Sequence, residues 1–193
     1  LVVALQANFC RVSLDQPGPG GVRQLHCTRR TRLGKSGARI CAGDRVRVEG
    51  IDWTAGRGAV GGLEPRSNQL RRPSVANVDR MMVVVALSEP ALDPLQLTRF
   101  LITAEATGRP VELGLTKADL LPAAAVREWC ERVAAWGYPV HPVSIRSGEG
   151  VEDLRRSLSR PGIAVLCGPS GVGKSILLNA LVPELALRVA AVS

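Results

Sequence analysis

The chain has 193 residues, of which 46% are hydrophobic and 22% are charged, and this composition is typical of a folded protein rather than a disordered one. The longest apolar run covers only residues 81–87, whereas a membrane-spanning helix needs about 20 such residues. The net charge of +8 lies within residues 1–72, which contain 13 of the 25 Lys and Arg but 5 of the 17 Asp and Glu. The charge distribution predicts a basic binding module followed by a near-neutral one.

Five cysteines, at positions 10, 27, 41, 130 and 167, are scattered along the chain without any C-x-x-C pair. A structural zinc site needs closely spaced ligand pairs, and a disulfide framework is usually denser in a small secreted protein. We therefore expect reduced thiols and no zinc site in this chain. The expected compartment is the cytoplasm, or a plastid stroma if a transit peptide preceded Leu1.

The first segment has the pattern of a small β-barrel. Short apolar stretches at 1–5, 45–48 and 57–60 are predicted strands, and Gly- and Pro-rich turns stand at 17–21 and 55–58. An OB-type barrel is one candidate, and the pattern alone also permits an SH3-like barrel. The excess of positive charge ends near Pro73, where a proline would also interrupt strand pairing. The predicted domains are therefore residues 1–72 and 73–193.

The second segment alternates strands with helices. A continuous apolar run predicts the first strand, and amphipathic stretches ending at glycine predict the helices. The predicted strands cover 81–87, 111–116, 140–144 and 163–167, and the predicted helices cover 94–107, 122–136, 150–158 and 176–181. This alternation is typical of a parallel, doubly wound α/β sheet.

Residues 168–175 read GPSGVGKS and match the Walker A pattern G-x-x-x-x-G-K-[ST], between a predicted strand and a predicted helix. The glycines allow successive N–H groups to surround a phosphate, and the helix N-terminus adds a favourable dipole. Lys174 supplies a charge to the β- and γ-phosphates, and the Ser175 hydroxyl is a predicted Mg²⁺ ligand. The predicted phosphate-binding residues are Gly168, Pro169, Ser170, Gly171, Val172, Gly173, Lys174, Ser175 and Ile176.

Two further motifs predict which base is bound. Thr116, Lys117, Ala118 and Asp119 form a T-K-x-D tetrad after a predicted strand. The Asp119 carboxylate can accept from N1–H and the 2-amino group of guanine, a donor pair that adenine lacks. After the next predicted strand, Ser144 and Ile145 begin a loop that resembles the S-A-x loop around guanine O6.

The order of these motifs is unusual. In an ordinary GTPase the phosphate loop comes first and the base-reading motifs come last, whereas here Thr116 and Ser144 precede Gly168. A circular permutation preserves the folded site while opening the chain elsewhere, so the same pocket can still assemble. The expected fold is therefore an incomplete, circularly permuted P-loop GTPase domain.

With its permuted motif order and a basic barrel ahead of the motifs, the sequence resembles the small-ribosomal-subunit biogenesis GTPases, the RsgA family. The resemblance extends to GDRV at 43–46, RPSVANVD at 72–79 and LTKADLL at 115–121. It implies an OB-fold, a permuted GTPase domain that binds GTP or GDP with Mg²⁺, and GTP hydrolysis during late maturation of the small subunit. The implied partners are the small ribosomal subunit and its rRNA, with no membrane partner, and we expect a monomer.

The implied RNA contacts fall on the basic stretch of the barrel. The candidate residues are Arg23, Arg29, Arg30, Arg32, Lys35 and Arg39. Aromatic residues are few in this segment, chiefly Phe9 and Trp53, so phosphate and shape contacts are expected rather than base stacking.

The sequence departs from the family pattern in three ways. Thr116 stands where the family usually has Asn, which predicts a modest loss of guanine affinity, and Ile145 replaces the usual Ala. The family's switch I, D-x-P-G loop and zinc-binding domain would all lie beyond Ser193. We therefore expect this chain to bind nucleotide but to hydrolyse little, and we assign no catalytic residue within it.

Two other readings remain open from the sequence. An ATP-using P-loop protein, such as a kinase, would bind ADP as well as GDP. A non-enzymatic RNA-binding protein with a degenerate nucleotide fold would bind RNA without regard to nucleotide.

Overall fold

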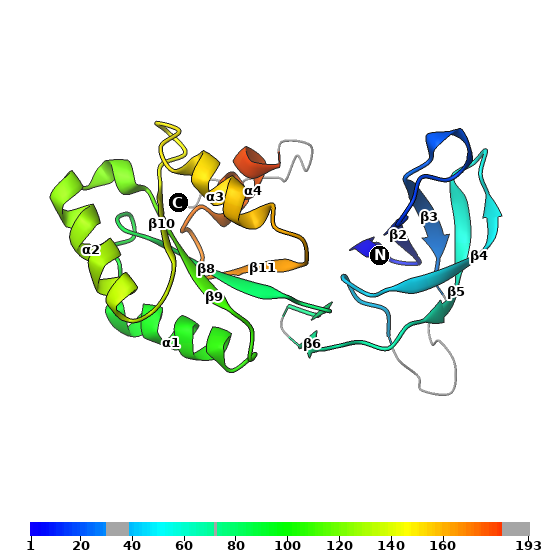
Figure 1. Cartoon of the computed structure of the whole chain (residues 1–193), viewed down its shortest axis with the longest axis horizontal. Coiled ribbons are helices and arrows are strands. Elements are labelled where there is room, and N and C mark those ends of the chain that lie inside the picture. Colours follow the sequence, from blue (N-terminus) through cyan, green and yellow to red (C-terminus); the bar gives the residue numbers. More distant parts are fainter. Residues whose placement is uncertain (30–38, 72, 183–193) are drawn as a thin grey trace. The chain divides into compact units, whose positions relative to one another are not determined.

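The computed structural model describes residues 1–29, 39–71 and 73–182, and the chain divides into two compact units, Leu1–Val78 and Asp79–Ser193 (Figure 1). Among the described residues of the first unit, the regular elements are β-strands and a short 3₁₀ turn at Pro19–Gly21. The second alternates strands and helices. The two units divide after Val78, six residues beyond the predicted boundary after residue 72.

Five strands of the first unit form one sheet in the order β1-β2-β3-β5-β4. Their bounds are Val2–Leu5 (β1), Phe9–Ser13 (β2), Gln24–Thr28 (β3), Val46–Asp52 (β4) and Arg57–Leu63 (β5). Strands β3 and β5 are parallel, and the other pairs are antiparallel. Val2 closes the sheet, since its N–H donates to Asp44 O and its carbonyl accepts from Gly43 N–H, both at 2.8 Å. This is an OB-type barrel, which decides against the SH3-like alternative.

The barrel core comes from strict alternation along β2 and β3. Cys10 and Val12 of β2, and Leu25 and Cys27 of β3, are all buried, whereas the residues between them are exposed. The sequence analysis did not single out these two strands, although a period of two is visible in both. Burial raises the pKa of the Cys10 and Cys27 thiols, and all five cysteines are free, as expected.

A two-stranded hairpin follows the barrel, formed by β6 (Gln69–Leu70) and β7 (Val75–Ala76). The proposed boundary between residues 72 and 73 falls within its turn. The buried Asp44 carboxylate holds the start of this segment, because it accepts from the Arg66 guanidinium at 2.7 and 2.8 Å.

The second unit is built on a parallel sheet in the order β10-β9-β8-β11. Its strands are Arg80–Ala86 (β8), Val111–Thr116 (β9), Val140–Val143 (β10) and Ala164–Cys167 (β11). Its helices are Pro94–Glu105 (α1), Ala123–Ala135 (α2), Val151–Leu158 (α3) and Lys174–Leu181 (α4). The predicted α/β fold is confirmed, with each element ending within two residues of its predicted limits. Strand β11 lies beside β8 although about 80 residues separate them in the chain (Figure 1).

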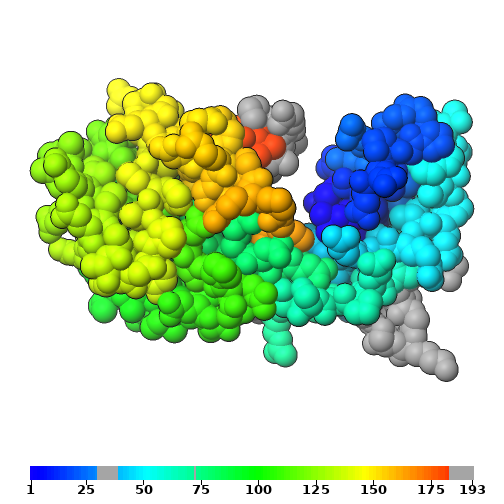
Figure 2. Space-filling model, viewed as in Figure 1, coloured from blue at the N-terminus to red at the C-terminus, as the bar shows by residue number. Residues whose placement is uncertain are grey.

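Helix α4 is held against α3, and the two lie next to each other in the space-filling view, α3 in yellow-orange and α4 in red (Figure 2). Leu154 of α3 and Leu177 of α4 are fully buried in one core cluster with the sheet. The Arg155 guanidinium also donates to the carbonyls of Ala180 and Leu181, at 2.8 and 3.4 Å. These two carbonyls at the C-terminal end of α4 have no hydrogen-bond partner within the helix, and Arg155 supplies one.

An ionic cluster around the buried Glu112 carboxylate joins β9, β10 and the end of α3. The Glu112 carboxylate accepts from Ser157 Oγ at 2.6 Å, contacts His141 Nε2 at 2.9 Å and pairs with Arg160. Burial by itself would raise the pKa of Glu112, but the hydrogen bonds from Ser157, His141 and Arg160 outweigh it and the pKa is lowered.

This lowered pKa predicts a pH-dependent stability. A depressed pKa in the folded state stabilises the fold above the unfolded-state value, roughly pH 4, and that contribution disappears as the pH falls further. We expect Glu112→Gln to lower the free energy of unfolding by about 2 kcal/mol at pH 7. Urea unfolding at pH 7 and pH 3 would measure this, and a difference between the two proteins that does not shrink at pH 3 would contradict it.

Candidate functional site: a phosphate loop and two base-reading loops

The predicted motifs gather at one edge of the parallel sheet. In parallel strands all carboxyl ends lie at the same edge, where α/β proteins bind ligands. The tetrad at 116–119 follows β9, the loop at 144–150 follows β10, and the phosphate loop at 168–173 follows β11. The loop that follows β8 joins them there. Residues more than 50 positions apart therefore lie at one site.

The phosphate loop has the backbone conformation that its glycines permit. Gly168, Gly171 and Gly173 all have positive φ angles, of 147°, 80° and 87°. A Cβ atom at Gly168 would lie 2.0 Å from the Val84 carbonyl oxygen of the neighbouring strand β8, so this position requires glycine. The loop leads directly into α4, whose first two residues are Lys174 and Ser175. A cradle of backbone N–H groups ahead of a helix N-terminus fits a phosphate.

The Lys174 side chain folds back into this loop. Its ammonium donates to the Gly168 carbonyl at 3.0 Å and also contacts the Pro169 carbonyl. Burial lowers the pKa of Lys174, and interaction with the nearby Cys167 thiol opposes that shift. A half-buried cation in a glycine-rich loop ahead of a helix N-terminus is an electrostatic arrangement that suits a polyphosphate.

Thr116 connects the base tetrad to the phosphate loop. Its buried hydroxyl lies 2.6 Å from the Val172 carbonyl oxygen and 3.2 Å from the Val85 carbonyl oxygen, so the shorter contact is the main hydrogen bond. The Val172 side chain is itself buried in the core cluster. The threonine that departs from the family's asparagine therefore still ties the two motifs together.

This bond makes Thr116 a sensitive position. We expect Thr116→Val to lower the free energy of unfolding by about 1–2 kcal/mol, because it leaves the buried Val172 carbonyl with one hydrogen bond fewer. Loosening the loop should also weaken GDP binding several-fold. Thr116→Ser keeps the hydroxyl and is the matched control. Thermal unfolding and GDP titration of both variants test this, and equal behaviour of the two would contradict it.

The rest of the tetrad shapes a sharp turn. Lys117 adopts a left-handed conformation with φ of 57°, and its ammonium contacts the Glu89 carbonyl in the loop after β8. The 3₁₀ turn Ala118–Leu120 follows and leaves the Asp119 carboxylate exposed at the site. Lys117 therefore joins the loops after β8 and β9, and Asp119 is free to accept hydrogen bonds from a ligand.

The loop after β10 is closed by its own hydrogen bonds. The buried Ser144 donates its N–H to Glu149 O and accepts Gly148 N–H at its carbonyl, both at 2.9 Å. Gly150 passes so close to β10 that a Cβ atom would lie 2.0 Å from the Pro142 carbonyl oxygen. Ile145, larger than the family's usual Ala, packs partly buried against the core cluster. The larger side chain is therefore accommodated.

These loops surround a cavity of about 380 Å³. It is lined by Thr116, Lys117, Asp119, Ile145, Val172, Gly173 and Ile176, all predicted from the sequence. It is also lined by Glu89, Leu120 and Arg146, which the sequence analysis did not name. Arg146 directly follows Ile145 in the motif loop and could have been found there, whereas only the tertiary structure brings in Glu89.

The predicted RNA-binding residues are only partly within the described structure. Arg23 is exposed just before β3, and Arg39 is exposed ahead of β4. The Arg29 guanidinium instead donates to the Ala7 carbonyl, with Nε at 3.0 Å. Arg30, Arg32 and Lys35 lie outside the described residues.

In the part of the chain that the structure describes, no helix is long and apolar enough to cross a membrane. Among the same residues, no three His, Cys, Asp or Glu side chains are grouped so that they could hold a metal ion.

The fold and the site together define a class of protein. A P-loop follows the last strand of the parallel sheet, and the tetrad and the Ser144 loop come earlier in the chain but at the same edge. This arrangement is a circularly permuted P-loop GTPase fold, preceded by an OB-type barrel.

Comparison with known proteins identifies the family. The RsgA GTPase family profile matches residues 63–193, so this chain belongs to that family. The small ribosomal subunit biogenesis GTPase RsgA of Parasynechococcus marenigrum (strain WH8102) is 54% identical over 193 residues, which are all of this chain and 64% of that protein. The chain thus spans just under two thirds of the length of this relative and of two further curated relatives.

Two solved structures share the whole arrangement. YjeQ from Thermotoga maritima superposes with a TM-score of 0.80 at 32% identity, over 97% of this chain and 66% of that one. YloQ, described as a circularly permuted GTPase, gives a TM-score of 0.76 at 27% identity, over 95% of this chain and 63% of that one. The permuted fold expected from the motif order is confirmed.

Proposed function

We propose that this chain is the nucleotide-binding part of a GTPase that assists late maturation of the small ribosomal subunit. The observation that carries the proposal is the assembly of the phosphate loop, the tetrad and the Ser144 loop around one cavity at the carboxyl edge of the sheet. Lys174 and the loop N–H groups would bind the β- and γ-phosphates. Asp119 would select guanine by accepting from N1–H and the 2-amino group, while the backbone beside Ile145 would donate to O6.

A magnesium ion fits the same place. Ser175 is the second residue of α4, and its exposed hydroxyl lies at the helix end where the phosphates would be bound. Mg²⁺ prefers hard oxygen ligands and commonly combines one hydroxyl with phosphate oxygens and water. When bound, the ion would neutralise part of the phosphate charge.

We propose that the chain by itself binds nucleotide much better than it hydrolyses GTP. Hydrolysis needs groups that position an attacking water and stabilise the charge on the transferred phosphoryl group. Among the described residues lining the cavity, those to which we give a role would bind the base or the phosphates, and we assign none of them to positioning water.

Competition binding tests the nucleotide assignment. A fluorescent GDP analogue with Mg²⁺ would be displaced by unlabelled GDP, ADP or XDP. We expect GDP to compete at least 100-fold better than ADP. Equal competition by ADP would point to an ATP-using protein, and no binding by a chain with native circular dichroism would reject the nucleotide site. Sustained turnover of GTP by this chain, well above the uncatalysed rate, would reject only the slow-hydrolysis part.

The proposed macromolecular partner is ribosomal RNA of the small subunit. The support is the family, whose curated relatives carry the name of small ribosomal subunit biogenesis GTPases, together with the positive charge of the barrel segment. A basic OB-type barrel suits a polyanion such as RNA.

A further inference from the structure

A row of cationic or ionisable side chains crosses the outer face of the barrel. Arg11 of β2 is the register partner of His26 on β3, and His26 is in turn the register partner of Arg57 on β5. All three are exposed. Direct cross-strand partners point to the same face of a sheet, so these side chains stand side by side. With neighbouring strands about 4.8 Å apart, Arg11 and Arg57 are separated by about 10 Å across the sheet.

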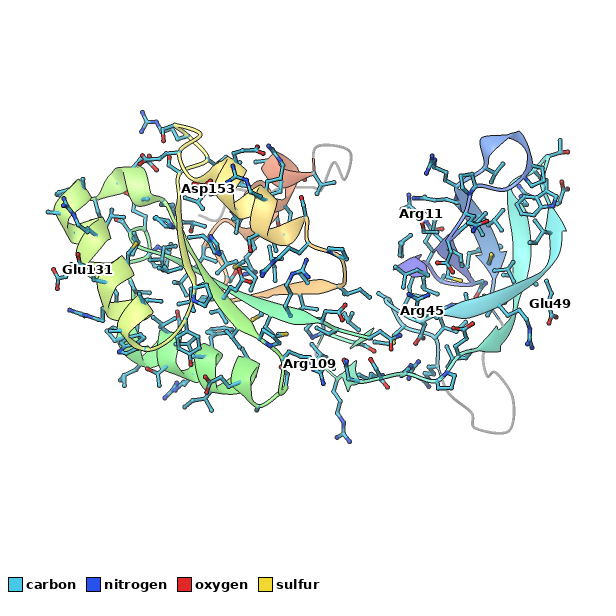
Figure 3. The ribbon with its side chains drawn as sticks, viewed as in Figure 1. Arg11, Arg45, Glu49, Arg109, Glu131 and Asp153 are labelled. Atoms are coloured by element: carbon cyan, nitrogen blue, oxygen red, sulfur yellow. The ribbon has the colours of Figure 1, made fainter. Side chains whose placement is uncertain are left out.

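This row is not neutralised by the barrel itself. Among the described residues, none of the three forms an ion pair, whereas Arg47 on β4 pairs with Glu49 at 3.4 Å. Figure 3 shows Arg11 on the β2 side of the barrel and Glu49 on the β4 side. Asp52 is the register partner of Arg57, and its carboxylate accepts the Ala55 N–H but forms no ion pair with Arg57 in the described structure. Within the described residues, the positive charges of Arg11 and Arg57 are therefore unpaired.

An exposed aromatic ring stands beside the row. Phe9 lies two residues before Arg11 on the same face of β2, and 46% of its surface is exposed. Its register partner is Thr28, whose own partner is Ala59, so only small side chains stand next to the ring. Trp53, by contrast, packs against the barrel core.

We propose that Phe9, Arg11, His26 and Arg57 form a surface that binds single-stranded RNA, with the cations on the phosphates and a base stacked on Phe9. Phe9, Arg11 and Arg57 lie outside the basic stretch between residues 23 and 39, and only His26 falls within it. The inference rests on the proposed rRNA role of the barrel. The β2–β3 face is where OB-type barrels accommodate oligonucleotides. An exposed ring next to a line of cations suits a chain of phosphates and bases better than a carboxylate-rich protein.

Salt-dependent RNA binding tests the surface. Fluorescence anisotropy would follow a fluorescein-labelled, unstructured RNA of mixed sequence binding to the 193-residue chain over a series of KCl concentrations. We expect the double variant Arg11→Gln with Arg57→Gln to raise Kd about tenfold. The slope of the logarithm of the association constant against the logarithm of the KCl concentration should become shallower by about 1.4, because each lost phosphate contact on a single strand accounts for about 0.7. Phe9→Ala should raise Kd about fivefold without changing the slope.

The matched control removes the same charge elsewhere on the barrel. Arg45 pairs with Asp15 at 3.9 Å and Arg47 with Glu49, so Arg45→Gln with Arg47→Gln should change Kd by less than about twofold and leave the slope unaltered. Binding of the fluorescent GDP analogue should be the same in every variant, and thermal unfolding confirms that each is folded.

Three outcomes would overturn the inference. If both double variants lose RNA affinity equally, overall charge rather than this surface binds RNA. If polyglutamate displaces the RNA through Arg11 and Arg57 while Phe9→Ala has no effect, the surface accepts an acidic protein. If the unaltered chain binds GDP but no RNA, the surface and the proposed rRNA role both fail, while the nucleotide site stands.

Discussion

Replacing Lys174 with alanine is expected to weaken GDP binding by at least about 100-fold, which corresponds to about 2.7 kcal/mol of binding free energy. Lys174 is the charged side chain inside the phosphate loop, where its ammonium now donates to the Gly168 carbonyl. A bound phosphate would take over that interaction as a charge-assisted hydrogen bond, which is among the strongest that proteins make. Titration of the fluorescent GDP analogue measures the loss directly.

Ser170→Ala is the matched control for this variant. Ser170 is exposed in the same loop, and the backbone N–H groups that would surround the phosphate are unchanged by the substitution. We expect it to alter Kd by less than about threefold. Thermal unfolding without nucleotide should be similar in both variants, and GDP should raise the melting temperature of Ser170→Ala only. Retained GDP binding by folded Lys174→Ala would refute the phosphate-loop assignment.

Asp119→Asn is expected to exchange the base preference of the site from guanine to xanthine. The carboxylate of Asp119 can accept two hydrogen bonds from guanine, whereas an asparagine amide would direct an N–H donor at the 2-amino group. Xanthine presents a carbonyl at that position and therefore accepts from the amide. We expect GDP affinity to fall about 100-fold and XDP affinity to rise by a similar factor, measured by competition.

Glu89→Gln provides the control, because it removes one exposed carboxylate from the same cavity without touching the tetrad. Its backbone carbonyl, which contacts Lys117, remains in place. We expect less than a threefold change in GDP affinity and no gain for XDP. If Glu89→Gln and Asp119→Asn shift the preference alike, the negative charge of the pocket rather than a specific hydrogen-bond pair would select the base.

The sequence by itself determined the nucleotide motifs and the alternation of the second unit. Walker A chemistry is contained in eight consecutive residues, since the loop N–H groups, Lys174 and Ser175 are close in the chain and stay close in the fold. The same holds for Thr116 to Asp119, which occupy one turn. The permuted order of the motifs could also be predicted from the sequence, because it depends only on their positions along the chain.

Only the tertiary structure decided which distant residues meet. The bond from Thr116 to Val172 joins loops 56 residues apart, and the threonine that makes it stands where the family usually has asparagine. Glu89 enters the cavity because β8 happens to lie between β9 and β11.

The barrel shows the same division between local and distant information. Its basic charge and Gly-rich turns were visible in the sequence, but the register that places Arg11, His26 and Arg57 side by side depends on the order of three strands. Sheet pairing links residues by hydrogen bonds across the fold rather than along the chain, so a local pattern predicts a strand but not its neighbour. For this reason the sequence showed which segment carries the positive charge. The structure showed which of its side chains lie together on one face without forming an ion pair among the described residues.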